Sequence, residues 1–145
     1  PHVHAQLDVY GGVDLSHGKA STSLFADNYL LTTAGVDWMC AQYWPGPTRW
    51  SETKASPLLA DDLSETPPTV VVIAGFDPIR DDSYAYVEAL TAAGVEVDVH
   101  EWLGQGHGFF TAGDVLPTGR DAVKRAALAL RAMVDRAIDL APKAQ

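Results

Sequence analysis

The sequence contains little cysteine and no long apolar run. Its single cysteine, Cys40, cannot form an internal disulfide, which suits a reducing compartment, and we expect a cytoplasmic protein. No stretch approaches the roughly 20 apolar residues of a membrane-spanning helix, so no transmembrane segment is expected. The first residues also lack the charged and apolar zones of a signal peptide. A signal on a longer parent chain stays open, because the sequence begins at Pro1 rather than at methionine.

Basic residues are scarce as well. The sequence has 10 Lys and Arg against 19 Asp and Glu, which gives a formal net charge of -9. Nucleic acid and anionic membrane surfaces would repel such a chain, so neither is expected as a partner. The rest of the composition, 47% hydrophobic and 20% charged over 145 residues, is that of one globular domain with room for a core.

The clearest strand in the sequence is the segment Thr69–Gly75. It is almost continuously apolar and rich in β-branched residues, which predicts a strand covered on both faces, as in a parallel sheet between helices. Asp77 follows directly, at the strand end where open α/β sheets place their chemistry. The predicted fold class is therefore α/β.

A helix and a second strand follow Asp77. We expect one of residues 81–83 to cap the helix and Gly94 to end it as a left-handed C-cap. The segment Val95–Trp102 alternates apolar and polar residues and predicts the next strand. The loop after this strand presents His107, so one strand–helix–strand unit brings a carboxylate and an imidazole to the same edge of the sheet.

Three further elements are expected. Alternation in Val3–Tyr10 predicts the first of three parallel strands, and a helix should run from Thr32 or Thr33 to Trp44. The longest helix follows residues 115–118 and carries an apolar stripe that faces the core. The stripe is predicted to consist of Val123, Ala126 or Ala127, Leu130, Met133 or Val134, and Ala137 or Ile138.

Residues 11–32 lack helical periodicity and are predicted to cross the strand ends as a long loop. The apolar residues of this loop, Leu30 and Leu31 among them, either line a pocket or anchor the loop. Both interpretations stay open on the sequence alone.

Two short segments carry a resemblance to a known family. Asp77–Asp81, with the sequence Asp-Pro-Ile-Arg-Asp, is followed by Gly-His-Gly-Phe at Gly106–Phe109. This order resembles the end of α/β-hydrolases of the hormone-sensitive-lipase type, in which the first aspartate of Asp-Pro-Leu-x-Asp and the histidine of His-Gly-Phe complete a Ser-His-Asp triad. Ile79 stands where the family usually has leucine. The resemblance extends more weakly over the whole chain.

The resemblance implies a fold, an activity and a site. The fold would be the C-terminal part of an α/β-hydrolase, about three parallel strands flanked by helices, and the activity would be that of a carboxylesterase or lipase. Asp77 and His107 would be catalytic, with Leu30, Leu31, Ile79 and Phe109 as candidate substrate-binding residues. We expect a small ester or an acylglycerol as substrate and no cofactor.

The family's nucleophile is missing from this sequence. Neither a His-Gly-Gly-Gly oxyanion segment nor a Gly-x-Ser-x-Gly elbow occurs in it, and no serine has the flanking glycines that the strained elbow needs. We therefore expect residues 1–145 to be the C-terminal segment of a single α/β-hydrolase domain, with the N-terminal half as its partner. The chain by itself is expected to be inactive, and it could form a homo-oligomer.

Several alternatives compete with this hypothesis. Asp77 could simply cap a helix while His107 serves as a turn residue, and the chain could be a catalytically silent fragment that acts as an assembly or binding module. Asp81 is interpreted as a helix cap and loop brace rather than as a second catalytic acid. His2 and His4 form a His-x-His pair, but zinc sites normally need three or four convergent ligands, so no metal site is expected.

Overall fold

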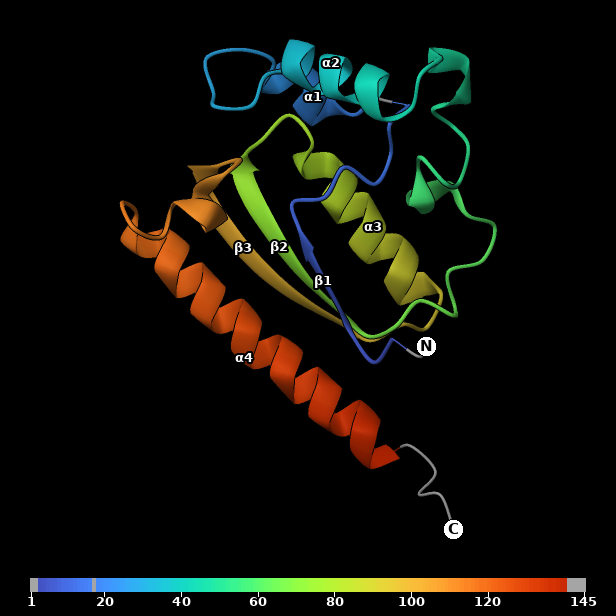
Figure 1. Cartoon of the computed structure of the whole chain (residues 1–145), viewed down its shortest axis with the longest axis vertical. Coiled ribbons are helices and arrows are strands. Elements are labelled where there is room, and N and C mark those ends of the chain that lie inside the picture. Colours follow the sequence, from blue (N-terminus) through green and yellow to red (C-terminus); the bar gives the residue numbers. More distant parts are fainter. Residues whose placement is uncertain (1–2, 17, 141–145) are drawn as a thin grey trace.

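Three parallel strands form one sheet in the order β1-β2-β3 (Figure 1). In the computed structural model, which describes residues 3–16 and 18–140, the strands are β1 (Gln6–Val9), β2 (Thr69–Phe76) and β3 (Val97–Gly106). The predicted parallel α/β sheet is thus confirmed. β1 is shorter than expected, and β3 continues past Trp102 through the glycine-containing segment that the sequence suggested was a loop.

One long helix covers each face of the sheet. Helix α3 (Arg80–Ala92) lies on one side and α4 (Pro117–Leu140) on the other (Figure 1). Gly94 has φ 80°, so the predicted left-handed end of α3 is confirmed. The predicted cap at residues 81–83 is wrong, because α3 already begins at Arg80 and its N-cap residue, Ile79, makes no side-chain cap hydrogen bond.

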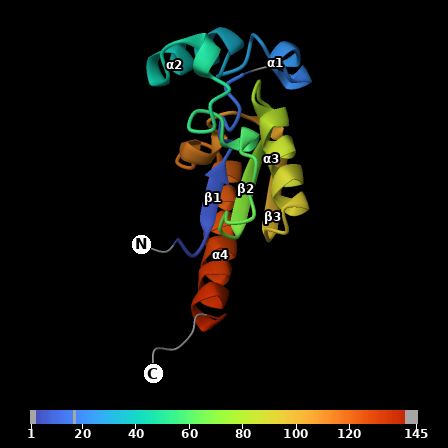
Figure 2. The same ribbon diagram turned by 90° about the vertical axis from the view of Figure 1, so that its right-hand side faces the viewer.

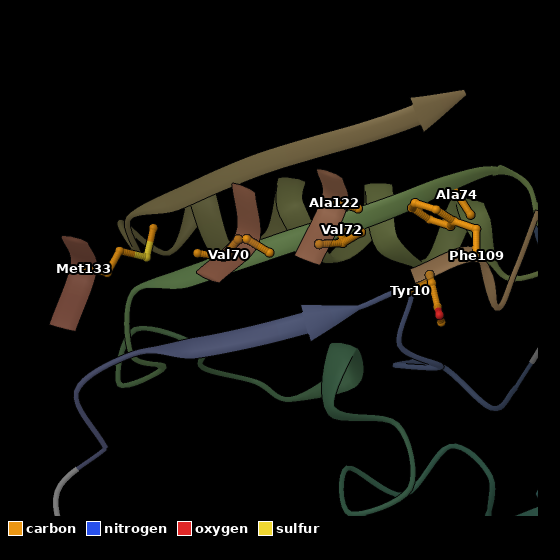
Figure 3. Packing of buried hydrophobic residues seen from close by; sticks show 8 residues of the cluster. Tyr10, Val70, Val72, Ala74, Phe109, Ala122 and Met133 are labelled. Carbon is orange, nitrogen blue, oxygen red and sulfur yellow. The ribbon is translucent and has the colours of Figure 1, made fainter. Parts of the chain in front are cut away.

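The main core lies between β2 and α4 (Figure 3). Val70, Val72 and Ala74 alternate along β2 and are fully buried, as the two-residue period of a strand requires. From α4 they meet small or flexible side chains, Ala122, Ala126 and Met133. The predicted α4 stripe is wrong at its first position: Val123 is 43% exposed and Ala122 faces the sheet instead. The small side chain of Ala122 lets the axis of α4 lie close to β2.

Short helices gather beyond the carboxyl ends of the strands (Figures 1 and 2). They are α1 (Ala20–Leu24) and α2 (Thr33–Tyr43), while the 3-10 turns η1 (Pro47–Arg49) and η2 (Pro57–Leu59) lie in the connector to β2. Thr32 caps α2, because its side chain accepts a hydrogen bond of 3.1 Å from the Gly35 N–H.

The short helix α1 was not predicted, and Asp81 explains why it forms. The Ser21 N–H donates to the Asp81 carboxylate at 2.9 Å, and the Ser21 hydroxyl donates to the Pro78 carbonyl at 3.0 Å. Both partners follow β2, so α1 is fixed to the sheet edge by groups remote in sequence. Asp81 therefore braces the loop that crosses the strand ends.

Among the described residues, no helix combines the length and the apolar character that a membrane span requires.

Candidate active site

Asp77 lies directly after β2 and is completely buried. Its carboxylate oxygens have separate partners. Oδ1 accepts a hydrogen bond of 3.0 Å from the Ile79 N–H, and Oδ2 lies 2.7 Å from Nδ1 of His107. A buried carboxylate is tolerated only when such partners replace water. The backbone contact fixes the orientation of the carboxylate and thereby the direction in which Oδ2 points.

His107 follows the last residue of β3 and begins the turn that leads into η3 (Phe109–Ala112). The next residue, Gly108, has φ 89°, a left-handed conformation that glycine adopts without strain. A carboxylate can only accept, so in the pair with Asp77 the hydrogen lies on Nδ1 and the lone pair on Nε2 of His107. The His107 side chain keeps 26% of its surface exposed and borders a pocket.

A close approach of β2 and β3 brings the two residues together. The register of the strands shifts between Ala74 and Phe76, and Phe76 pairs with Gly106. A Cβ atom at Gly75 would lie 2.1 Å from the Leu103 carbonyl oxygen, so only glycine permits this approach. Because β3 runs on to Gly106, His107 stands at the strand end rather than in the middle of a loop.

A pocket of about 220 Å³ opens beside His107. Its wall is mostly apolar and comes from α2, from the loop before α1 and from the start of α3. It is lined by Gly12, Asp14, Leu15, Leu31, Val36, Met39, Cys40, Tyr43, Ile79, Asp82 and His107.

The four candidate substrate-binding residues fall into two groups. Leu31 and Ile79 line the pocket, whereas Leu30 and Phe109 do not. Leu30 is 85% exposed and comes close to Gly108, where a Cβ would lie 2.9 Å from its Cδ2. Phe109 is only 3% exposed and belongs to the core between β2 and α4.

The pocket also contains charged groups that the sequence did not suggest. Nζ of Lys19 lies 2.8 Å from Oδ2 of Asp14 and 3.5 Å from Oδ1 of Asp82. Burial raises the pKa of Asp82 to about 6. Burial would also raise the pKa of Asp14, but hydrogen bonds from Lys19 and Ser16 outweigh it and lower that pKa. No local pattern joins these residues, because they come from a loop and a helix far apart in sequence.

The weak metal hypothesis gains no support. His2 lies outside the described residues, and within residues 3–16 and 18–140 no three or more His, Cys, Asp or Glu side chains converge as metal ligands would.

The comparison with known proteins identifies the family. A family model described as the alpha/beta hydrolase fold matches residues 1–111 of the chain. The chain belongs to the α/β-hydrolase family. Several of the relatives that it resembles are named esterases or carboxylic ester hydrolases, which agrees with the resemblance to hormone-sensitive-lipase-type hydrolases that the motifs carry.

Two curated relatives illustrate the similarity. Carboxylic ester hydrolase LipN of Mycobacterium tuberculosis is 37% identical over 102 residues, which cover 70% of this chain and 27% of that protein. An esterase of Gibberella moniliformis is 34% identical over 137 residues, which cover 90% of this chain and 43% of its own length. The chain thus spans less than half the length of these relatives.

A solved esterase from Pyrobaculum calidifontis has the same arrangement of elements. It superposes with a TM-score of 0.85 at 31% sequence identity, over 90% of this chain and 44% of the esterase chain. Here too the matching part is less than half of the enzyme.

Proposed function

We propose that this chain is part of a carboxylic ester hydrolase, an esterase or lipase, in which His107 acts as general base and Asp77 orients it. The observation that carries the proposal is the 2.7 Å contact between Nδ1 of His107 and the buried Asp77 carboxylate, beside an apolar pocket. A histidine held this way has the correct tautomer, and its cation is stabilised as it forms.

The proposed reaction needs a serine that these 145 residues do not offer in a suitable setting. The serine oxygen attacks the ester carbonyl while Nε2 of His107 takes the serine proton. The resulting imidazolium, stabilised by Asp77, gives that proton to the departing alcohol and leaves an acyl-serine. Water then releases the acid by the same transfers, with His107 again as base. We place the serine and the oxyanion hole in an N-terminal half of the same domain.

The substrate we propose is a small ester or an acylglycerol. The apolar wall at Leu31 and Ile79 suits an alkyl or acyl group placed next to His107. Leu30 could contact substrate at the rim beyond Gly108, whereas the burial of Phe109 favours a supporting role below the His107 turn. We propose no cofactor for this reaction.

Substitution of the pair in the whole natural protein tests the proposal. Asp77→Asn and His107→Ala should each lower kcat on p-nitrophenyl esters, by roughly 10⁴-fold for the aspartate, because a related triad loses about that much when its aspartate is neutralised. Both variants should keep the circular dichroism spectrum of the unchanged protein.

A second His–Asp pair on β3 supplies the control. Nε2 of His100 lies 3.3 Å from Oδ1 of Asp98, and neither residue lines the pocket. His100→Ala and Asp98→Asn should therefore keep nearly full activity. Normal activity in Asp77→Asn and His107→Ala would overturn the assignment and favour the alternative, a silent assembly or binding module.

A cytoplasmic location, suggested by the single cysteine, stays a prediction.

A further inference from the structure

Tyr10 has an unusual backbone conformation at the end of β1. Its φ is 40°, and among the described residues only Asn28 shares a positive φ without being glycine. Bulky residues rarely adopt this left-handed region, and residues held there often belong to functional sites. The Tyr10 N–H donates to the Val72 carbonyl at 2.8 Å, so pairing with β2 holds the residue in place.

This conformation sends the Tyr10 ring toward the His107 imidazole. The ring centroids lie 4.3 Å apart with 48° between the planes. Phe109 lies next to Tyr10 at 6.0 Å, and Figure 3 shows the two side chains together at the carboxyl end of the sheet. Asp77 contacts the imidazole at Nδ1, and Tyr10 packs against the ring itself. The imidazole is thus held from the ends of β1 and β2.

Tyr10 also packs against the turn that follows His107, through the ring of Phe109. Burial raises the pKa of the phenol, while hydrogen bonding with Thr111 and with the backbone of Phe110 and Gly108 acts in the opposite direction. The phenol therefore stays neutral at ordinary pH and interacts with the residues immediately after His107. Tyr10 is 9% exposed and is not among the residues that line the pocket.

We propose that Tyr10 is a positioning residue for His107. Its ring restricts rotation of the imidazole and packs against Phe109 in the turn that follows His107. The proposal rests on the proposed function, in which Nε2 of His107 must meet a serine oxygen within a narrow range of positions. Loss of the ring would let the imidazole leave this position, and small misplacements of a catalytic group cost a large factor in rate. Tyr10 itself would not touch substrate.

The test compares Tyr10→Leu with Tyr10→Phe in the whole natural protein. On p-nitrophenyl acetate, Tyr10→Leu should lower kcat by about 10- to 100-fold with little change in KM, because only the geometry of the base is disturbed. Tyr10→Phe keeps the ring and should restore most of kcat. A residue that only fills the core would not separate kcat from KM in this way.

A second readout does not depend on turnover. The proton on Nδ1 of His107, hydrogen-bonded to Asp77, should give a downfield resonance in the proton NMR spectrum. We expect this resonance to broaden or vanish in Tyr10→Leu and to persist in Tyr10→Phe. Asp77→Asn assigns the signal by altering it.

Tyr86 provides the matched control. It is 4% exposed, lies on α3 in a separate core cluster, and its hydroxyl accepts from Gln6 at 3.4 Å. Tyr86→Leu should lower the melting temperature and leave both kcat and the resonance unchanged. If Tyr10→Leu fails to fold, Tyr10→Asn replaces it with the same expectation, since asparagine tolerates a left-handed φ.

The outcomes separate the two proposals. A folded Tyr10→Leu or Tyr10→Asn with normal kcat and an unchanged resonance would overturn the positioning role. If His107→Ala retains activity, the proposed function fails instead, and the resonance still reports whether Tyr10 holds the imidazole.

Discussion

Two aspartates lie where water solvates their charge poorly. Burial raises the pKa of both Asp8 and Asp82 to about 6, against an ordinary value of 3.8. Oδ2 of Asp8 is buried and has no hydrogen-bond partner among residues 3–16 and 18–140. A carboxyl group whose pKa is raised by folding binds its proton more tightly in the folded state than in the unfolded chain. The stabilisation that the protonated Asp8 side chain gives to the folded state is therefore fully present below pH 3.8 and is lost as the pH rises through about 6.

Asp8→Asn should remove the part of this pH dependence that comes from Asp8. At about pH 8 the variant should be more stable than the unchanged protein by about 1–3 kcal/mol, since two pKa units correspond to nearly 3 kcal/mol. At about pH 3, where Asp8 is mostly protonated in both states, the difference should nearly vanish. Urea unfolding at the two pH values measures it.

The exposed Asp61 supplies the control for this prediction. Asp61→Asn should change the free energy of unfolding little at either pH. A stability gain in Asp8→Asn that does not vary with pH would mean that Asp8 is not held in the protonated form by burial.

At the residue scale, the sequence predicted Asp77 and His107 because both stand in short motifs after predicted strands. Tyr10, Lys19 and Asp82 were not predicted as parts of the site. Their contacts depend on the path of the chain between residues 10 and 33, which carries no periodic signal. Of the four residues proposed to bind substrate, Leu31 and Ile79 line the pocket and Leu30 and Phe109 do not, and their role in binding stays a prediction.

The junction of β2 and β3 depends on one glycine. Alanine at Gly75 would place its Cβ 2.1 Å from the carbonyl oxygen of Leu103 and 2.5 Å from the Leu103 Cα, both backbone atoms that cannot move without separating the strands. We expect Gly75→Ala to destabilise the fold by about 2–4 kcal/mol, as overpacking against a rigid neighbour does. It should also lower activity, because it moves the strand end that carries Asp77.

Gly104 on the neighbouring strand is the matched position. A Cβ there meets nothing within 4 Å, and its φ is not positive. Gly104→Ala should therefore leave the free energy of unfolding nearly unchanged. Equal stability of the two alanine variants in urea unfolding would contradict the role assigned to Gly75.

At the element scale, the three strands and the helices α2, α3 and α4 were predicted, whereas α1 and the end of β3 were not. α1 consists of Ala-Ser-Thr-Ser-Leu, which has no apolar stripe, and is fixed by contacts with Pro78 and Asp81. The end of β3 contains Gly104 and Gly106, which suggested a loop. Pairing with β2 through backbone groups needs no side chain, so the strand continues to Gly106.

The whole molecule exposes surfaces that we expect a complete α/β-hydrolase to cover. β1 is an edge strand of the described sheet, with β2 as its only neighbour there. On α2, Trp38 is 65%, Met39 46% and Tyr43 68% exposed. Unpaired strand edges and clustered apolar side chains recruit other chains. The α2 side chains also border the pocket, where Met39 and Tyr43 form part of the wall.

We therefore predict that the 145-residue chain on its own either self-associates or is held by the N-terminal half of its domain, and that alone it hydrolyses no ester above background. Size-exclusion chromatography with light scattering over a dilution series measures the association.

Trp38→Gln should weaken self-association, because it removes the largest apolar side chain of the exposed α2 surface. Leu128→Gln is the control, since Leu128 is 64% exposed on α4, away from that surface. A monomer at all concentrations would show that these surfaces need no partner, and an ester hydrolysis rate that disappears in His107→Ala would show that the chain contains a nucleophile outside the usual elbow.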